Sequence, residues 1–282
     1  MSRLFEALQR SELGEAGFEF PLPEISVAEL VQEPAQKKNI LNASDLSQFP
    51  SVPASPESSF ICITQEESLG AEKFRFLGVR LRQLQQAREL KTVLITSTIP
   101  EEGKSMVSGN LAVTLARKKQ QKVLLLDGDL RRPVLAARLG LQGLRGLSEW
   151  LESDTSKITN IHYLEGPGFW FLPSGKPPAN PLELMQSGRL SGLLQQLAAW
   201  FDWILIDSPP VLPLADTSVW ARLSDGVLLV AREGTTEKQR LARGVQALDR
   251  STLLGVVLNS CTPSGHSNYY QRYGAPAVKS NL

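Results

Sequence analysis

The stretch ITSTIPEEGKS, residues 95–105, decides the fold class of this chain. It begins inside the apolar run TVLITS (residues 92–97), which is typical of a buried β-strand, and it ends where a helical pattern over residues 104–118 starts. Its last three residues complete the pattern G-x-x-x-x-G-K-[ST], although Thr98 occupies the place of the first glycine. Between a strand and a helix, this segment predicts a loop whose backbone N–H groups bind a phosphate at the helix N-terminus.

Four more apolar runs follow along the chain without polar alternation, as expected for parallel strands that are buried on both faces. They cover residues 122–127, 201–207, 225–232 and 253–259. Helical patterns lie between them, including one over residues 181–200 with Asn180 as its cap and Pro181 at its first position. We therefore predict an α/β fold, a parallel sheet with helices on both faces and a ligand at the carboxyl ends of its strands.

Two of these strands end in acids. Asp127 and Asp129 lie in the segment LLLDGDLRRP, and Asp207 ends the run WILID, a pattern typical of an aspartate that holds Mg²⁺ directly or through water. Each motif alone has an ordinary explanation, an acidic turn or a capped strand end. Together with the loop, in which Lys104 reaches phosphates and Ser105 ligates Mg²⁺, they indicate one nucleotide site.

Composition limits the alternatives. The 282 residues carry a net charge of +1, so no overall field favours binding to nucleic acid or to an acidic membrane surface. We find neither a transmembrane stretch of about 18 apolar residues nor a secretory signal. Cys62 and Cys261 lack metal or redox spacing, and the two histidines, His162 and His266, argue against a histidine-based metal site. These observations favour a cytoplasmic protein.

The first part of the chain differs from the rest. After a short helical pattern in the first ten residues, Pro-, Ser- and Glu-rich sequence such as QFPSVPASPESS cannot bury much apolar area, which predicts a flexible leader over residues 1–58. The first ten residues either dock on a partner or form a frayed helix without function. A longer helix is predicted over residues 64–88, from a capping box of Thr64 and Glu67 and a stripe of leucines.

Three of the four tyrosines lie close together in the segment HSNYYQRYG near the end of the chain: Tyr269, Tyr270 and Tyr273. They belong to a polar tail over residues 265–282. Such a tail can enter the site of a neighbouring molecule as a phosphate acceptor. Alternatively, the tyrosines pack on the sheet as a terminal aromatic cluster.

The combination of a loop that ends in GKS with LLLDGDLRRP and ILIDSPPV resembles the bacterial tyrosine kinases of capsule and exopolysaccharide synthesis. The resemblance extends from about residue 60 to residue 273 and includes LPSGKPPANPLELM and LSDGVLLVAREG. It implies that residues 59–264 form a P-loop NTPase-like kinase domain. The implied activity is an ATP- and Mg²⁺-dependent protein-tyrosine autokinase that regulates polysaccharide polymerisation or export.

The resemblance also implies a role for each motif. Lys104 would neutralise charge on the β- and γ-phosphates, Asp127 would accept or orient the tyrosine proton, and Arg131 would orient the acidic pair or contact phosphate. The implied Mg²⁺ ligands are Ser105, Asp129 and Asp207. The implied nucleotide contacts are Pro100, Glu101, Glu102, Gly103, Lys104, Ser105 and Met106, with Asn259 on the adenine side. The implied phosphate acceptors are Tyr269, Tyr270 and Tyr273.

Two positions depart from the family pattern. Glu101 stands where family members usually carry glycine, and a carboxylate and a side chain at this place are expected to weaken nucleotide affinity. The ring-forming helix of the family carries E-x-x-R-x-x-R. Glu72 and Arg75 match it, whereas Gly78 replaces the second arginine, and Arg80 is a candidate substitute from a different face.

The implied partners are further copies of this chain in a ring and a membrane-bound chain-length-determining protein that activates the kinase at the inner face of the plasma membrane. Two alternatives remain open, a P-loop ATPase switch with incidental tail tyrosines and a nucleotide-sensing scaffold without tyrosine kinase activity. Ile99 lies where the related septum-positioning and chromosome-partitioning ATPases carry a signature lysine, which argues against that type of hydrolysis.

Overall fold

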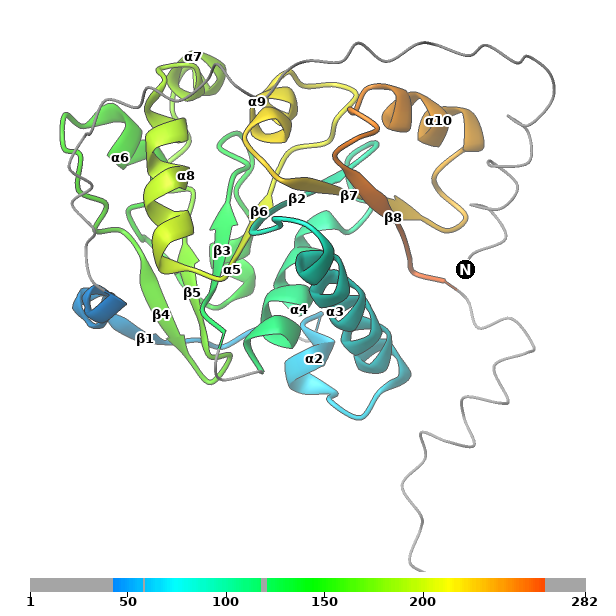
Figure 1. Cartoon of the computed structure of the whole chain (residues 1–282), viewed down its shortest axis with the longest axis horizontal. Coiled ribbons are helices and arrows are strands. Elements are labelled where there is room, and N and C mark those ends of the chain that lie inside the picture. The colour runs from blue at the N-terminus through cyan, green and yellow to red at the C-terminus, as the bar shows by residue number, and fades with distance from the viewer. Residues whose placement is uncertain (1–42, 58, 118–120, 262–282) are drawn as a thin grey trace, which may run out of the picture. The chain divides into compact units, whose positions relative to one another are not determined.

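The computed structural model describes residues 43–57, 59–117 and 121–261, and all structural statements below concern these residues (Figure 1). Its strands are β1 (Ser51–Pro53), β2 (Thr92–Ser97), β3 (Val123–Asp127), β4 (His162–Glu165), β5 (Phe169–Leu172), β6 (Trp203–Asp207), β7 (Gly226–Arg232) and β8 (Leu253–Asn259). Its helices are η1 (Ala43–Gln48), α2 (Ile61–Thr64), α3 (Leu69–Ala87), α4 (Lys104–Ala116), α5 (Leu135–Arg138), α6 (Leu147–Glu152), α7 (Pro181–Met185), α8 (Arg189–Trp200), α9 (Asp216–Arg222) and α10 (Lys238–Gln246). The first ten residues and the three tail tyrosines lie outside the described residues.

One eight-stranded sheet has the order β1-β4-β5-β3-β6-β2-β7-β8, which can be followed across Figure 1. From β5 to β8 all neighbouring strands are parallel, whereas β4 is antiparallel to β5. β1 is parallel to β4, so these two strands run against the other six. The predicted α/β fold is confirmed, and the five predicted strands correspond to β2, β3, β6, β7 and β8.

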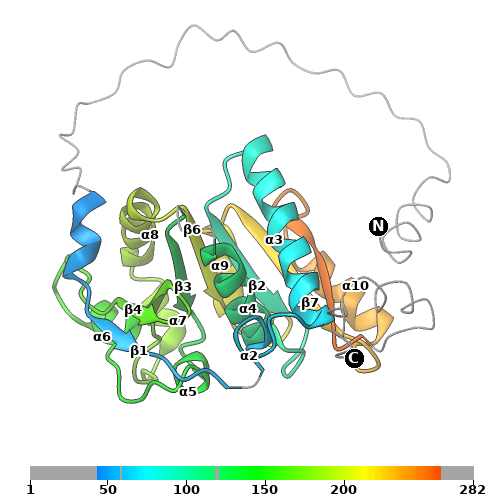
Figure 2. The same ribbon diagram turned by 90° about the horizontal axis from the view of Figure 1, so that it is seen from below.

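The central strands are buried on both faces, which explains their unbroken apolar sequence. In β3, Leu124 and Leu126 belong to a core cluster that also contains side chains of α8 and α9. Val123 and Leu125 belong to the cluster on the other face, which contains side chains of α3 and α4. Figure 2 shows α2, α3 and α4 next to one another beside β2. Helices therefore cover both faces of the sheet, as predicted.

The folded part of the chain begins before residue 58, which differs from the predicted end of the leader. Phe49, just after η1, is buried and its ring centroid lies 5.9 Å from that of Trp200. In β1, Ser51 pairs with Tyr163 at the edge of the sheet. A three-residue strand among prolines has no periodicity, so composition alone misses it.

The helix predicted over residues 64–88 corresponds to α3, which begins later than predicted. α2 ends at Thr64, and α3 begins at Leu69 with Ser68 as its N-cap, whose hydroxyl accepts a hydrogen bond from the Ala71 N–H (3.2 Å). The predicted capping box of Thr64 and Glu67 is therefore wrong. Ser68 is also a good N-cap residue, and it lies directly before the apolar stripe.

The helix predicted over residues 181–200 is divided. α7 starts at Pro181 as expected, but Gly188, with a left-handed φ of 78°, separates it from α8. Asn180 does not cap the α7 backbone through its side chain, because its Nδ2 donates to the Glu183 carboxylate (2.7 Å). The break turns the amphipathic helix α8 so that its leucines pack on the sheet.

Candidate active site

The loop between β2 and α4 contains two residues with a left-handed backbone conformation, Glu101 (φ 66°) and Gly103 (φ 92°). A Cβ atom at Gly103 would lie 2.1 Å from Nδ2 of Asn259, so only glycine fits there. Glu101 has a side chain in a conformation that L-residues rarely adopt, which costs on the order of 1 kcal/mol. The loop therefore follows the expected path at Gly103 and is strained at Glu101.

The loop is tied to the ends of two other strands. Nδ2 of Asn259, the last residue of β8, donates to the Glu102 carbonyl (3.0 Å), and Nη1 of Arg232, the last residue of β7, donates to the Glu101 carbonyl (3.3 Å). The Glu102 side chain is fully buried. Its Oε2 accepts from the Ile99 N–H (2.9 Å) and its Oε1 from the Thr236 hydroxyl.

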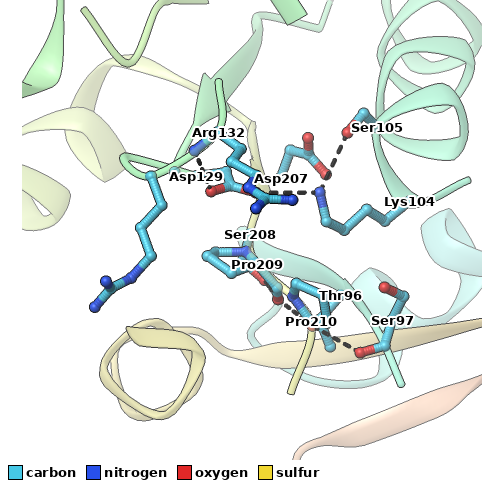
Figure 3. Close-up of polar contacts among 12 residues, drawn as sticks. Thr96, Ser97, Lys104, Ser105, Asp129, Arg132, Asp207, Ser208, Pro209 and Pro210 are labelled. Atoms are coloured by element: carbon cyan, nitrogen blue, oxygen red, sulfur yellow. Dashed lines mark hydrogen bonds and ion pairs between the residues drawn. The ribbon is translucent and has the colours of Figure 1, made fainter. Parts of the chain in front are cut away.

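Lys104, the first residue of α4, points toward the acids at the strand ends (Figure 3). Its Nζ lies 3.4 Å from Oδ2 of Asp129 and 3.5 Å from Oγ of Ser105. Burial alone would lower the pKa of Lys104, but the negative charges of Asp207 and Asp129 outweigh burial and raise it. Lys104 therefore remains a cation at neutral pH.

The strand register brings Asp127 directly opposite Asp207, and both side chains are fully buried. Oδ1 and Oδ2 of Asp127 accept from the N–H groups of Asp129 and Leu135, each at 3.3 Å. Burial, followed by the charges of Asp207 and Asp129, raises the pKa of Asp127 well above its usual value. Burial also raises the pKa of Asp207, although Lys104 opposes this shift.

The aspartates at the strand ends repel one another, so they are suited to bind a hard cation such as Mg²⁺. Oδ1 of Asp207 accepts from the Ser108 hydroxyl (3.2 Å), but its buried Oδ2 has no hydrogen-bond partner in the described part of the chain. The described His, Cys, Asp and Glu side chains do not form a group of three that could hold a metal by themselves. Mg²⁺ usually takes one or two carboxylates and completes its shell with phosphate oxygens and water. Ser105, Asp129 and Asp207 fit that pattern.

A cavity of about 770 Å³ lies over the loop, within the usual range for a small-molecule site. Its lining contains the predicted residues Pro100, Glu101, Gly103, Lys104, Ser105, Met106, Asp129 and Arg131. The predicted residues Glu102, Asp127, Asp207 and Asn259 do not line it. Cations outnumber anions in the lining, which suits a polyphosphate.

Arg131 does not orient the acidic pair, in contrast to one of its two expected roles. Its Nε and Nη2 bind both carboxylate oxygens of Asp216, at 2.7 and 3.0 Å, and Asp216 is buried at the start of α9. Asp129 is held instead by the Arg132 backbone N–H, which donates to Oδ1 (3.0 Å). Because Arg131 also lines the cavity, contact with a phosphate remains a prediction.

Three further arginines line the cavity and were not predicted: Arg132, Arg138 and Arg232. Arg132 lies within the segment LLLDGDLRRP, and Arg232 ends a predicted parallel strand. The sequence therefore contained the information needed to predict both as site residues. Arg138 belongs to a four-residue helix without periodicity. Asn259, expected on the adenine side, contacts the loop backbone, and its Oδ1 accepts from the Ser260 N–H (2.8 Å).

Comparison with known proteins gives consistent relatives. No protein-family model matches the chain. The chain is 34% identical over 215 residues to the tyrosine-protein kinase YwqD of Bacillus subtilis, which covers 76% of this chain and 90% of YwqD. It is 28% identical over 236 residues to the tyrosine-protein kinase Etk of Escherichia coli, 83% of this chain but 32% of Etk. The chain thus corresponds to nearly all of YwqD and to about a third of Etk.

Solved structures give the same picture. The kinase domain of Escherichia coli ETK superposes with a TM-score of 0.65 and 28% identity, over 73% of this chain and 82% of that domain. The septum site-determining protein MinD of Pyrococcus horikoshii, complexed with Mg-ADP, has a TM-score of 0.50 and 25% identity over 62% of this chain and 72% of MinD. The fold is therefore shared with kinase domains and with a nucleotide-binding P-loop protein.

Proposed function

The chain belongs to the bacterial tyrosine-protein kinases, and from this premise we propose that it is an ATP-dependent autokinase that phosphorylates tyrosines of its own tail. The comparisons confirm the resemblance that the three motifs indicated. The observation that carries the proposal is the position of Lys104, a cation whose side chain is 13% exposed at a helix N-terminus beside Asp129 and Asp207. This is where a transferred phosphoryl group needs positive charge.

Each residue of the site has a separate task in this proposal. Lys104 binds the β- and γ-phosphates, and the arginines Arg132 and Arg232 add positive charge along the same cavity. Ser105, Asp129 and Asp207 would hold Mg²⁺, which when bound neutralises charge on the phosphate oxygens. Asp127 would take or orient the tyrosine proton, and a pKa raised by burial makes its carboxylate a stronger base than that of an ordinary aspartate.

The acceptors in the proposal are Tyr269, Tyr270 and Tyr273, in a ring of identical chains. Two features of α3 bear on the ring. Phe76 and Val79 are 69% and 45% exposed, which suits a helix that meets another copy. A Cβ atom at Gly78 would lie 3.0 Å from Cγ2 of Thr114 in α4, so the arginine that the family pattern places there has little room.

The proposed physiological role is control of exopolysaccharide or capsule polymerisation or export, together with a membrane-bound activator. Within the described residues, no helix has the length and apolar character needed to cross a membrane. In the proposed role, that activator recruits the chain to the inner face of the membrane. Of the predicted leader, residues 1–42, which precede η1, are the segment we propose for additional docking, and unchanged partner binding after their deletion would contradict this.

The decisive experiment is intact-protein mass spectrometry with site mapping after incubation with Mg-ATP. The wild type is compared with Lys104→Met and with the control Lys122→Met, which removes a lysine directly before β3, at the end of the strand remote from the loop. We expect phosphate on Tyr269, Tyr270 or Tyr273 in the wild type and the control, and none in Lys104→Met. ATP binding without phosphorylation, even with a membrane activator, would favour an ATPase switch or a nucleotide-sensing scaffold, which phosphate release distinguishes.

A further inference from the structure

Glu102 is a buried carboxylate without a cation. It is fully buried directly before Gly103 and Lys104, and the ion pairs among the described residues do not include it. Its two oxygens accept from neutral donors, the Ile99 N–H and the Thr236 hydroxyl. Because burying a carboxylate is costly unless it is well hydrogen-bonded, these two contacts are the reason that the side chain can lie there.

The contact with Ile99 shapes the loop. Glu102 reaches back three residues to the Ile99 N–H (2.9 Å) and closes a turn in which Glu101 has a φ of 66°. This turn leads directly into Gly103 and the N-terminus of α4. Glu102 therefore fixes the path of the segment in which Thr98 replaces the first glycine of the phosphate-loop pattern.

The contact with Thr236 connects the loop to a second segment. The Thr236 hydroxyl oxygen accepts from the Arg232 N–H (2.8 Å), so its hydrogen is free to point at Oε1 of Glu102. Thr98 packs on the same region, because a Cβ atom at Gly244 of α10 would lie 3.0 Å from the Thr98 hydroxyl oxygen. The segment that runs from the end of β7 into α10 thus packs against the phosphate loop.

We propose that Glu102 and Thr236 are positioning residues that hold the phosphate loop in the form that binds nucleotide. We call the group of Ile99 N–H, Glu102 carboxylate and Thr236 hydroxyl the carboxylate staple. It does not touch the nucleotide itself, since Glu102 and Thr236 do not line the cavity. The staple sets the affinity for nucleotide from the turn between β7 and α10. This inference rests on the proposed nucleotide binding.

The test measures the Kd for Mg-ADP by titration calorimetry on the full chain. Thr236→Val removes the hydroxyl and keeps the shape, and we expect Mg-ADP to bind about tenfold more weakly, because Oε1 of Glu102 is then buried without a partner. Thr236→Ser should restore most of the affinity that valine loses. Thr235→Val is the matched control, because the neighbouring Thr235 is exposed.

Three readouts separate positioning from a general loss of stability. A purely structural role would lower the melting temperature of Thr236→Val and leave the Kd of the folded protein unchanged. In kinase assays, loss of the staple should raise the KM for ATP more than it lowers kcat, because the staple organises the loop before chemistry. Glu102→Gln is a second variant of nearly the same size, and its effect on Kd should not add to that of Thr236→Val, since both break one group.

The possible outcomes lead to different conclusions. If Thr236→Val and Glu102→Gln both bind Mg-ADP with the wild-type Kd, the proposed positioning role of the staple is wrong, while the proposed nucleotide binding stands. Failure of the wild type to bind Mg-ADP would overturn the proposed function, and the staple with it. Weaker binding in Thr236→Val that serine restores, with Thr235→Val unchanged, is the expected result.

Discussion

The carboxyl ends and the amino ends of the parallel strands both border a cavity and both carry aspartates, but the aspartates at the two ends have different partners. A cavity of about 770 Å³ borders the carboxyl ends and one of about 720 Å³ borders the amino ends, and aspartates lie at both. At the amino ends, Oδ2 of Asp225 accepts from the N–H groups of Lys91 and Thr92 (2.8 and 2.7 Å). Oδ2 of Asp202 accepts from the Lys122 N–H (2.7 Å).

The aspartates of the amino ends join the starts of neighbouring strands, and backbone donors satisfy them. Those of the carboxyl ends, Asp127, Asp129 and Asp207, are buried close together and share one lysine, Lys104, and two of them have raised pKa values. The comparison teaches that cavity size does not identify the active site of this fold. Incompletely neutralised charge is the better guide, because the buried Oδ2 of Asp207 has no hydrogen-bond partner among the described residues, whereas backbone N–H groups bind Asp202 and Asp225.

The largest effect should come from Asp207→Asn at the carboxyl ends. The change removes one negative charge from the proposed Mg²⁺ site, and we expect tyrosine phosphorylation to fall on the order of 10²-fold or more. The rate of phosphate incorporation under saturating Mg-ATP checks this, with circular dichroism as the control for folding. Phosphorylation at the wild-type rate would remove Asp207 from the proposed site.

The opposite result is expected for Asp225→Ala at the amino ends. Two backbone N–H groups lose their acceptor, so the free energy of unfolding should fall by about 1–3 kcal/mol. Urea unfolding measures the loss. Phosphorylation per folded molecule should stay unchanged, and a loss of activity in fully folded protein would mean that the two ends are not separate in function.

Asp127→Asn should stabilise the protein at high pH only. The folded protein holds the Asp127 proton to a higher pH than the unfolded chain, whose value is about 4, because the pKa is raised on folding. Wild-type stability therefore decreases as the pH rises from the unfolded pKa through the folded pKa. We expect the variant to match the wild type near pH 3, below the unfolded pKa, and to be more stable by about 1 kcal/mol or more near pH 8, with less kinase activity.

Urea unfolding across that pH range is the measurement for Asp127→Asn. Parallel stability curves for the wild type and the variant would show that Asp127 is not the group whose burial shapes the pH dependence.

The smallest effect is expected for Glu101→Gly. Glycine relieves the left-handed backbone and removes a carboxylate from the cavity, but it adds freedom to the unfolded chain, so the net gain in stability should be below about 1 kcal/mol. We expect Mg-ADP to bind a few-fold more tightly. Glu101→Ala removes the charge and keeps the strain, so the difference between the two variants measures the backbone part. Equal Kd values for both would assign the whole effect to charge.

The sequence predicted the strands that are buried on both faces, because burial leaves a continuous apolar run that periodicity analysis detects. It missed β1, β4 and β5, which have three or four residues each and give no period. It merged α7 with α8, because a single glycine such as Gly188 is tolerated inside many helical patterns.

The site was predicted where a motif fixes geometry locally. Lys104 and Ser105 at the start of α4 and Asp129 after β3 line one cavity, as their motifs implied. The pair of Arg131 and Asp216 joins residues far apart in the sequence, and its partner choice depends on the packing of α9. Thr236 lies in a turn without any motif, so only the structure connects it with Glu102.

The place of β6 between β2 and β3 has a consequence for synthesis of the chain. β2 and β3 do not pair with each other, and Thr92 of β2 faces Ile204 of β6 across more than a hundred intervening residues. A ribosome delivers β6 last of the three, so the centre of the sheet cannot close on a half-made chain. Until then two apolar strands have unpaired edges, which are the surfaces that aggregate or engage chaperones during slow, non-local folding.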